Sequence, residues 1–176
     1  MFQDRRKSIQ MLTILSLLTA LHIILSRFFA FNAWNIRIGF AIIPSAVCAL
    51  LYGTLPTVAL ATASDILGFM LQPSGTYFPG FTLSSALCGA SLGFFLHDCK
   101  KGPLLLRALA AIFINRILIT LFVNTLWISI LYGSPYRGVL LTRIWQVAIL
   151  VPFHFFIIMS LGGVKHLHFL KRQLTT

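Results

Sequence analysis

Two ionisable side chains inside long apolar runs are the residues of this sequence with the most evident chemistry. Asp65 lies in the middle of the run 55–71, and Arg116 lies inside the run 104–131. An aspartate at the centre of a membrane helix costs about 2.5 to 3.5 kcal/mol on translocon scales, so such a residue is expected to have a role. Two interpretations remain open. Either the two side chains form an internal ion pair, or Asp65 accepts hydrogen bonds from a polar ligand.

Helical periodicity predicts what surrounds Asp65. At about 100° per residue, Gly68, Phe69 and Gln72 fall on the same face of a helix as Asp65. The carboxylate is therefore predicted to point into a cavity that is bordered by small and aromatic groups.

Arg116 belongs to a polar stripe on an otherwise aliphatic helix. Such stripes in membrane helices face a bundle interior or a wet cavity. The other members of the stripe are Thr120, Asn124 and Trp127.

Aromatic and arginine side chains gather near the ends of the apolar runs on one predicted side of the membrane. Interfacial aromatic belts are ordinary on both sides, but Tyr52 is the only Tyr or Trp that we can place at the opposite boundary. Flat rings and guanidinium groups suit a planar, anionic small molecule, which they bind by stacking and by bidentate carboxylate contacts. The side chains of this predicted mouth are Arg27, Trp34, Arg37, Tyr77, Phe78, Phe81, Tyr132, Tyr136, Arg137, Arg143 and Trp145.

The elements that position these residues are predicted to be membrane-spanning helices. The chain has 176 residues, of which 58% are hydrophobic and 10% charged, whereas soluble domains carry about 25% charged residues. A span needs about 20 apolar residues. We therefore expect an all-α integral membrane protein, a single domain over 1–176 that forms a compact bundle of six transmembrane helices. The predicted spans are 8–29, 38–52, 55–71, 81–97, 104–131 and 140–164.

The formal net charge of +11 indicates orientation rather than a nucleic-acid partner. The basic residues form short clusters between apolar runs, and most fall on the side that an even number of spans gives to both termini. Both termini are therefore predicted to be cytoplasmic, and the first run is predicted to be an uncleaved span. The residues on this side are Arg5, Arg6, Lys7, Lys100, Lys101, Arg107, Lys165, Lys171 and Arg172.

Small residues at four-residue spacing mark two helix faces that can approach another helix closely. Ser85, Gly89 and Gly93 are expected to pack within the bundle. For Ser16 and Ala20, the spacing leaves open whether the contact is internal or with a partner helix.

Enzyme and cofactor motifs are absent from the sequence. It contains no G-x-x-x-x-G-K-[ST], H-E-x-x-H or G-x-S-x-G pattern, so we expect no catalysis, no metal site and no cofactor. An intramembrane enzyme is the alternative from another class. Ser45 and His154 are its only candidates for nucleophile and base, and no third group orients them.

Five stretches of the chain carry a family resemblance. They are Ala20 to Phe28, Arg37 to Pro44, Asp65 to Gly68, Tyr77 to Leu87 (YFPGFTLSSAL) and Thr125 to Gly133 (TLWISILYG). In this order, the chain resembles the folate-specific substrate-binding subunits, called S components, of energy-coupling factor (ECF) vitamin transporters.

The resemblance implies a subunit of a prokaryotic plasma membrane that captures folate outside the cell. It implies docking on a transmembrane coupling subunit with two ATPase subunits, through the face where Ser16 and Ala20 stand in place of the usual Ala-x-x-x-Ala. An S component for riboflavin or a pterin-like molecule is the alternative. The predicted ligand-binding residues are Arg27, Arg37, Asp65, Phe69, Tyr77, Phe78, Phe81, Arg116, Asn124, Trp127 and Arg143.

Overall fold

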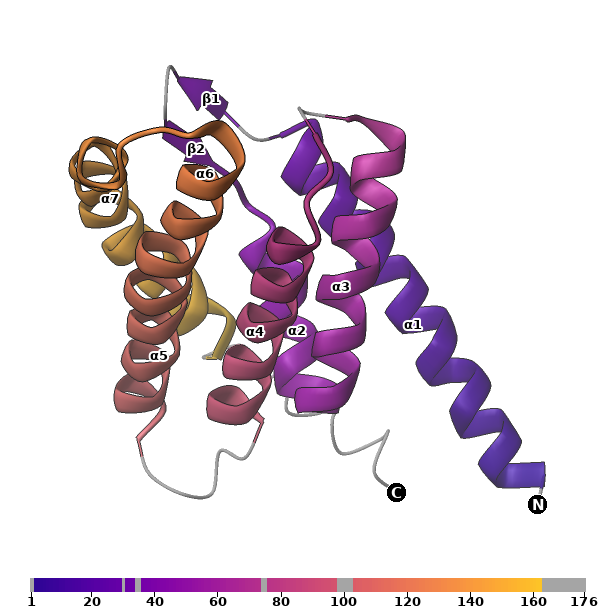
Figure 1. Cartoon of the computed structure of the whole chain (residues 1–176). Helices are drawn as coiled ribbons and strands as arrows, with labels where there is room; N and C mark the ends of the chain where they lie inside the picture. Colours follow the sequence, from indigo (N-terminus) through magenta and orange to yellow (C-terminus); the bar gives the residue numbers. More distant parts are fainter. Residues whose placement is uncertain (1, 30, 34–35, 74–75, 98–102, 163–176) are drawn as a thin grey trace.

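The computed structural model is a helical bundle with one small β-hairpin (Figure 1). It describes residues 2–29, 31–33, 36–73, 76–97 and 103–162. The elements in chain order are α1 (Phe2–Arg27), β1 (Phe31–Ala33), β2 (Ile36–Ile38), α2 (Ile42–Tyr52), α3 (Thr54–Leu71), α4 (Pro79–Leu96), α5 (Leu104–Phe113), η1 (Ile114–Val123), α6 (Asn124–Tyr132) and α7 (Tyr136–Gly162).

Among the described residues, five helices are long and apolar enough to cross a membrane, as predicted for those runs. Because α5, η1 and α6 follow one another without a break, they count as a single helix. The five segments are Ser8–Arg27, Thr54–Leu71, Pro79–Leu96, Leu105–Tyr132 and Tyr136–Leu161.

The second predicted span differs from the other five. Helix α2 begins at Ile42 rather than at Ile38 and has 11 residues, which at about 1.5 Å per residue falls well short of a hydrocarbon core of about 30 Å. It lies inside the bundle, where Ala46, Cys48 and Ala49 are fully buried. The count of six complete spans, and the cytoplasmic placement of both termini, therefore stay predictions.

The β-hairpin before α2 is a local addition to the predicted all-α bundle, whose helical fold class is confirmed. Strands β1 and β2 pair antiparallel, with Asn32 opposite Arg37. Pairing the two strands satisfies backbone groups that a bare loop would leave to solvent. In Figure 1 the hairpin lies at the same end of the bundle as the α6–α7 connection. We call this end the hairpin end.

The fifth predicted span contains a π-helix that its sequence did not reveal. Over Ile114–Val123 the backbone follows π geometry, and the Thr120 hydroxyl donates to the Asn115 carbonyl, five residues earlier, at 2.8 Å. π-Helical segments are rare and are frequent at functional sites. Two polar residues of the sequence-predicted stripe, Arg116 and Thr120, lie inside this segment.

Helices α3 and α4 approach each other closely because α4 presents glycine. A Cβ atom on Gly89 would lie 2.7 Å from the Thr57 carbonyl oxygen and 3.0 Å from the Ala61 Cβ, and one on Gly93 would collide with the Thr54 backbone. The interpretation of the strip as internal packing is confirmed for Gly89 and Gly93, whereas Ser85 of the same strip lines a cavity.

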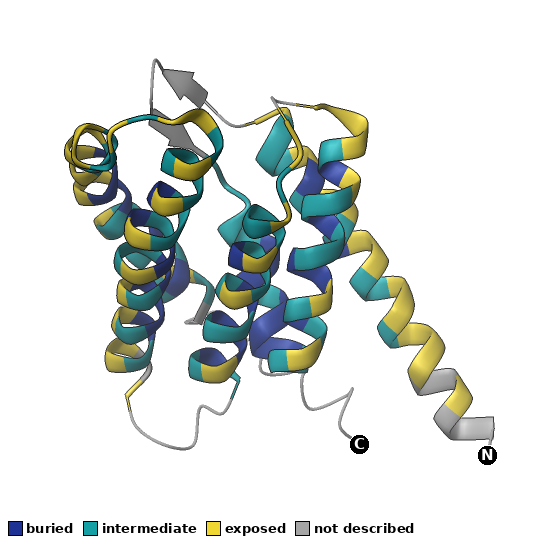
Figure 2. Ribbon diagram, viewed as in Figure 1, coloured by how far each residue is buried: buried dark blue, intermediate teal, exposed yellow. Residues whose placement is uncertain are grey.

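Buried and exposed residues divide the helices into inner and outer faces (Figure 2). Large exposed apolar side chains such as Leu17, Leu55 and Phe156 point outward, as lipid-facing residues do in a bilayer. The main core joins α2, α4, α5 and α7. Its buried members are Ala46, Ala49, Leu50, Leu92, Leu96, Ala108, Ala111, Ile112 and Ile158.

A pair of glycine-to-alanine substitutions tests the α3–α4 contact. Gly89→Ala should lower the free energy of unfolding by about 1–3 kcal/mol, because the new methyl group meets backbone atoms that cannot move aside. Gly138→Ala is the matched control, since its Cβ would lie 3.7 Å from the nearest atom, Pro135 Cγ. Thermal unfolding of the purified protein in detergent measures both. Equal melting temperatures for the two variants would contradict the close approach.

Candidate functional site

A cavity of about 310 Å³ opens among α1, α3, α4, α6 and the segment before α4. Its size lies at the lower end of the range of about 300–1,000 Å³ that is usual for small-molecule sites. We call it the aromatic cavity. Its lining residues are Arg27, Asp65, Phe69, Thr76, Tyr77, Phe78, Phe81, Ser85, Asn124, Ile128 and Tyr132.

Asp65 is held in the aromatic cavity by a hydrogen-bonded chain. The Thr82 hydroxyl donates to Asp65 Oδ2 at 2.8 Å, and the Tyr77 hydroxyl lies 3.1 Å from the same Thr82 oxygen. Because Thr82 uses its proton on the carboxylate, Tyr77 is the donor in the second bond. One carboxylate oxygen is thereby fixed, and the carboxylate keeps further acceptor capacity for a bound molecule.

Aromatic rings line the same cavity as this carboxylate. The Phe69 and Tyr77 ring centroids are 5.2 Å apart, and Phe78 lies 5.5 Å from Trp127 and 6.1 Å from Phe81. These spacings are those of aromatic pairs in protein cores. The cavity therefore offers flat apolar surfaces together with the carboxylate of Asp65.

Trp127 supports this wall without being one of the cavity-lining residues. Its indole N–H donates to the Ser84 hydroxyl at 3.1 Å, which ties α6 to α4. Gly80 leaves room for the ring, because a Cβ there would lie 2.7 Å from Trp127 Cδ2 and would collide with Phe78.

Arg27 brings a positive charge to the edge of the aromatic cavity. It is the last residue of α1, and its Nη1 group donates to the Gln72 carbonyl at 3.4 Å. The absence of a side chain at Gly68 leaves room for Arg27, since a Cβ atom at Gly68 would lie 3.0 Å from Arg27 Nε. A cation and a carboxylate therefore line the same cavity.

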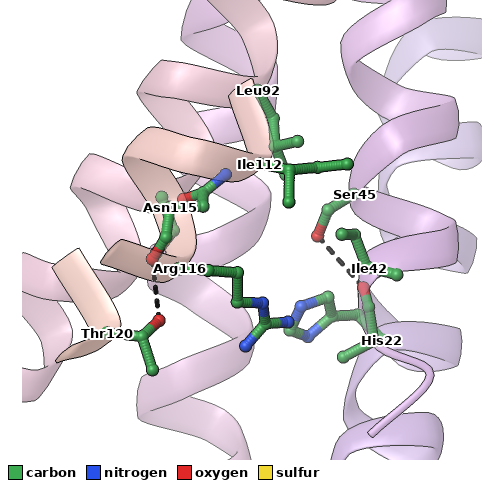
Figure 3. A pocket seen from close by; sticks show the side chains of 10 residues that line it. His22, Ile42, Ser45, Leu92, Ile112, Asn115, Arg116 and Thr120 are labelled. Atoms are coloured by element: carbon green, nitrogen blue, oxygen red, sulfur yellow. Dashed lines mark hydrogen bonds between the residues drawn. The ribbon is translucent and has the colours of Figure 1, made fainter. Parts of the chain in front are cut away.

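A second, smaller cavity of about 140 Å³ surrounds Arg116 (Figure 3). It lies between α1, α2, α4 and the α5–η1 helix, and we call it the arginine cavity. Its lining residues are His22, Ala41, Ile42, Ser45, Cys88, Leu92, Ile112, Asn115, Arg116 and Thr120.

Arg116 is hydrogen-bonded to His154 and not to Asp65. Its Nη2 group lies 2.9 Å from His154 Nε2, and His154 Nδ1 lies 2.6 Å from the Leu150 carbonyl. Since a carbonyl can only accept, Nδ1 carries the imidazole proton and Nε2 accepts from Arg116. The alternative of an Asp65–Arg116 ion pair is therefore wrong. The two charges line separate cavities and have separate partners.

The structure brings together most of the predicted ligand-binding residues, but not all of them. The aromatic cavity contains Arg27, Asp65, Phe69, Tyr77, Phe78, Phe81 and Asn124. Arg143 lies elsewhere and donates to the Thr120 carbonyl at 3.3 Å. Arg37 is in β2, and its side chain lies outside the described residues.

Three polar residues in or beside the two cavities, Thr82, Asn115 and His154, were not predicted as ligand-site residues. Thr82 has no signal in the sequence, because its pairing with Asp65 depends on how α3 packs on α4. Asn115 and His154 could have been noticed only as polar residues in apolar runs. Ser45 and His154, the candidates for an enzyme, each bond elsewhere, since the Ser45 hydroxyl donates to the Ala41 carbonyl at 3.2 Å.

The small residues of α1 face away from the bundle. Ser16 and Ala20 are both exposed, whereas Leu18 and Ile23 on the other side of the helix are buried. Internal packing, one of the two interpretations left open, is therefore not how this pair is used.

The sequence of this chain is similar to a family of transporter subunits. Residues 10–162 match the model of the family described as "ECF transporter, substrate-specific component". The chain is 34% identical over 152 residues to the folate transporter FolT of Clostridium novyi, which covers 86% of this chain and 87% of that protein. It is 26% identical over 125 residues to FolT of Leuconostoc mesenteroides, with coverage of 70% and 65%.

A solved structure shares the fold. The crystal structure of a FolT protein bound with folic acid superimposes with a TM-score of 0.79 and 28% sequence identity, over 86% of this chain and 92% of that one.

A double-mutant cycle tests the bond between Arg116 and His154. His154→Leu should lower the free energy of unfolding by about 1.5–3 kcal/mol, because a buried cation loses its acceptor. In the Arg116→Met background the same change should cost far less, since the cation is gone. Chemical unfolding in mixed micelles measures the four free energies. Additive effects of the two substitutions would show that the side chains do not interact.

Proposed function

Since the chain belongs to the family of substrate-specific components of ECF transporters, we propose that it is the folate-binding S component of such a transporter. Members of this family are transport subunits rather than enzymes, and the five long apolar helices make this one a multi-pass membrane protein. The relatives at 34% and 26% identity are folate transporters.

The aromatic cavity is the observation that carries the proposal. It combines one fixed carboxylate, flat rings and an arginine at its edge, and folate presents matching groups. The pterin offers adjacent N–H donors that Asp65 can accept together, and its ring faces suit Phe69, Tyr77 and Phe78. The glutamate carboxylates of folate suit Arg27.

An S component for riboflavin is the rival within the same class. Riboflavin is also flat, but it lacks the glutamate carboxylates for which a guanidinium group is the matching partner. The charge at Arg27, together with the folate-transporting relatives, favours folate.

The exposed pair on α1 suggests how the subunit works with its partners. Ser16 and Ala20 form a small-residue surface on a lipid-facing helix, which allows another helix to approach closely. We propose that this surface docks on a transmembrane coupling subunit, whose two ATPase subunits supply the energy. The hairpin end would then face outward in a prokaryotic plasma membrane, with both termini in the cytoplasm.

The ligand assignment is tested by substituting Asp65. Asp65→Asn should weaken folate binding about tenfold or more, as expected when hydrogen bonds to a charged acceptor are lost. Asp4→Asn is the matched control, because Asp4 lies in the first turn of α1, far along that helix from Arg27. Quenching of tryptophan fluorescence measures both affinities, since Trp127 contacts the cavity wall.

Two outcomes would contradict this assignment. Equal folate affinities for Asp65→Asn and Asp4→Asn would remove Asp65 from the site. Quenching of the unmodified protein by riboflavin, without quenching by folate, would overturn the specificity.

The docking assignment is tested separately from ligand binding. Ala20→Trp should abolish folate uptake by cells that express the complete transporter, because the bulky ring keeps the partner helix away. Its folate affinity in detergent should stay unchanged. Ala148→Trp, at another exposed alanine on α7, should spare both activities. Normal uptake by Ala20→Trp would refute the docking surface.

A further inference from the structure

The arginine cavity contains a positive charge, with a fully buried Nε atom, that the described residues do not neutralise. Arg116 donates one hydrogen bond to a neutral imidazole, and its Nε group is buried without a hydrogen-bond partner. A cation in this position is costly in an apolar bundle unless an anion compensates it.

The carboxylates of the chain do not supply that anion within the residues that the structure describes. The sequence has three acidic residues. Asp65 lines the aromatic cavity and is bonded to Thr82. Asp4 lies on α1 about 27 Å from His22, which lines the arginine cavity, at about 1.5 Å per residue. Asp98 falls outside the described residues.

Other side chains of the arginine cavity also have unmatched polar atoms. Asn115 is only 6% exposed, and its Oδ1 atom has no hydrogen-bond partner, nor does Nδ1 of His22. Figure 3 draws the side chains of Asn115 and Arg116 into the space between the helices. Buried polar groups are usually paired, so these atoms indicate that a polar ligand binds here. A half-turn of the Asn115 amide about its last side-chain bond presents its NH2 donors to the cavity in place of Oδ1.

The size of the cavity limits that guest. Its volume of about 140 Å³ is well below the range of about 300–1,000 Å³ that is usual for drug-sized ligands. It suits a single small charged group. The apolar walls formed by Ile42, Leu92 and Ile112 would strengthen the attraction between such a group and Arg116, because the local dielectric constant is low.

We propose that the arginine cavity is a binding site for a small monovalent anion, which takes a hydrogen bond from Arg116 Nε. The chemistry is that of a single carboxylate or a halide. The anion is either a free ion or a carboxylate of the transported molecule. The second source is possible because the two cavities are neighbours: Thr120 in this cavity and Asn124 in the aromatic cavity lie about one helical turn apart. The free-ion form of the proposal does not depend on folate being the ligand.

Formate is the probe for a free anion. Sodium formate, exchanged for sodium gluconate at constant ionic strength, should raise the melting temperature of the purified full chain in a saturable way, because a ligand that binds only the folded state stabilises it. Gluconate carries the same charge on a six-carbon chain and is therefore the bulky reference anion. Arg116→Gln should abolish the rise, and Arg107→Gln, a matched change in α5, should keep it.

The ester form of folate is the probe for a carboxylate of the ligand. If formate gives no saturable rise, folic acid should bind the unmodified protein at least about tenfold more tightly than its dimethyl ester, as for a hydrogen bond between charged groups. Arg116→Gln should remove most of that preference, whereas Arg107→Gln should preserve it.

A lysine substitution keeps the test decisive if Arg116→Gln does not fold. Arg116→Lys retains the charge but has no Nε–H at the same place, so its anion affinity should fall at least about threefold, as for one weakened hydrogen bond, while Arg107→Lys should match the unmodified protein. Two results would overturn the proposal. In the first, formate does not stabilise the protein and the ester binds as tightly as folic acid. In the second, both effects occur but substitution of Arg116 changes neither.

Discussion

The close approach of α3 and α4 is the contact on which the candidate site depends. Gly89 and Gly93 remove the side chains that would separate the two helices, so that α4 lies directly against the backbone of α3. One consequence lies nearer the hairpin end of the same helix pair, where Thr82 of α4 reaches Asp65 of α3. Without this approach, the half-buried carboxylate would lose its donor inside an apolar bundle, where unpaired charges are costly. Packing and ligand chemistry are therefore linked through one helix pair.

The π-helix explains why the polar groups of the fifth predicted span serve two cavities. On a regular α-helix, Arg116, Thr120, Asn124 and Trp127 would share one stripe. The π geometry of Ile114–Val123 changes the number of residues per turn, and the structure directs Arg116 and Thr120 to the arginine cavity but Asn124 to the aromatic cavity. The protein thus separates the Arg116 cation from the Asp65 carboxylate, although the sequence permits them to pair. Each charged side chain can then bind a different chemical group of a ligand.

The sequence predicts the fold well where hydrophobicity decides it. The long apolar runs became long helices, and the Gly89–Gly93 strip became a helix contact. Periodicity also placed Phe69 beside Asp65 in one cavity. The sequence pattern did not predict the β-hairpin or the short length of α2. Both depend on how the connection between α1 and α2 packs into the end of the bundle. The partners of Asp65 and Arg116 were equally hidden, since hydrogen bonds from Thr82 and to His154 join residues 17 and 38 positions apart. The docking role of Ser16 and Ala20 stays a prediction.

The central claim is that the aromatic cavity holds folate through Asp65. Native mass spectrometry of the chain, purified from folate-producing cells and released from detergent in the gas phase, tests it most directly. The account predicts a bound species with the mass of a folate in the unmodified protein and its loss in Asp65→Asn. A bound flavin, no small molecule on the unmodified protein, or a folate retained equally by Asp65→Asn would contradict it.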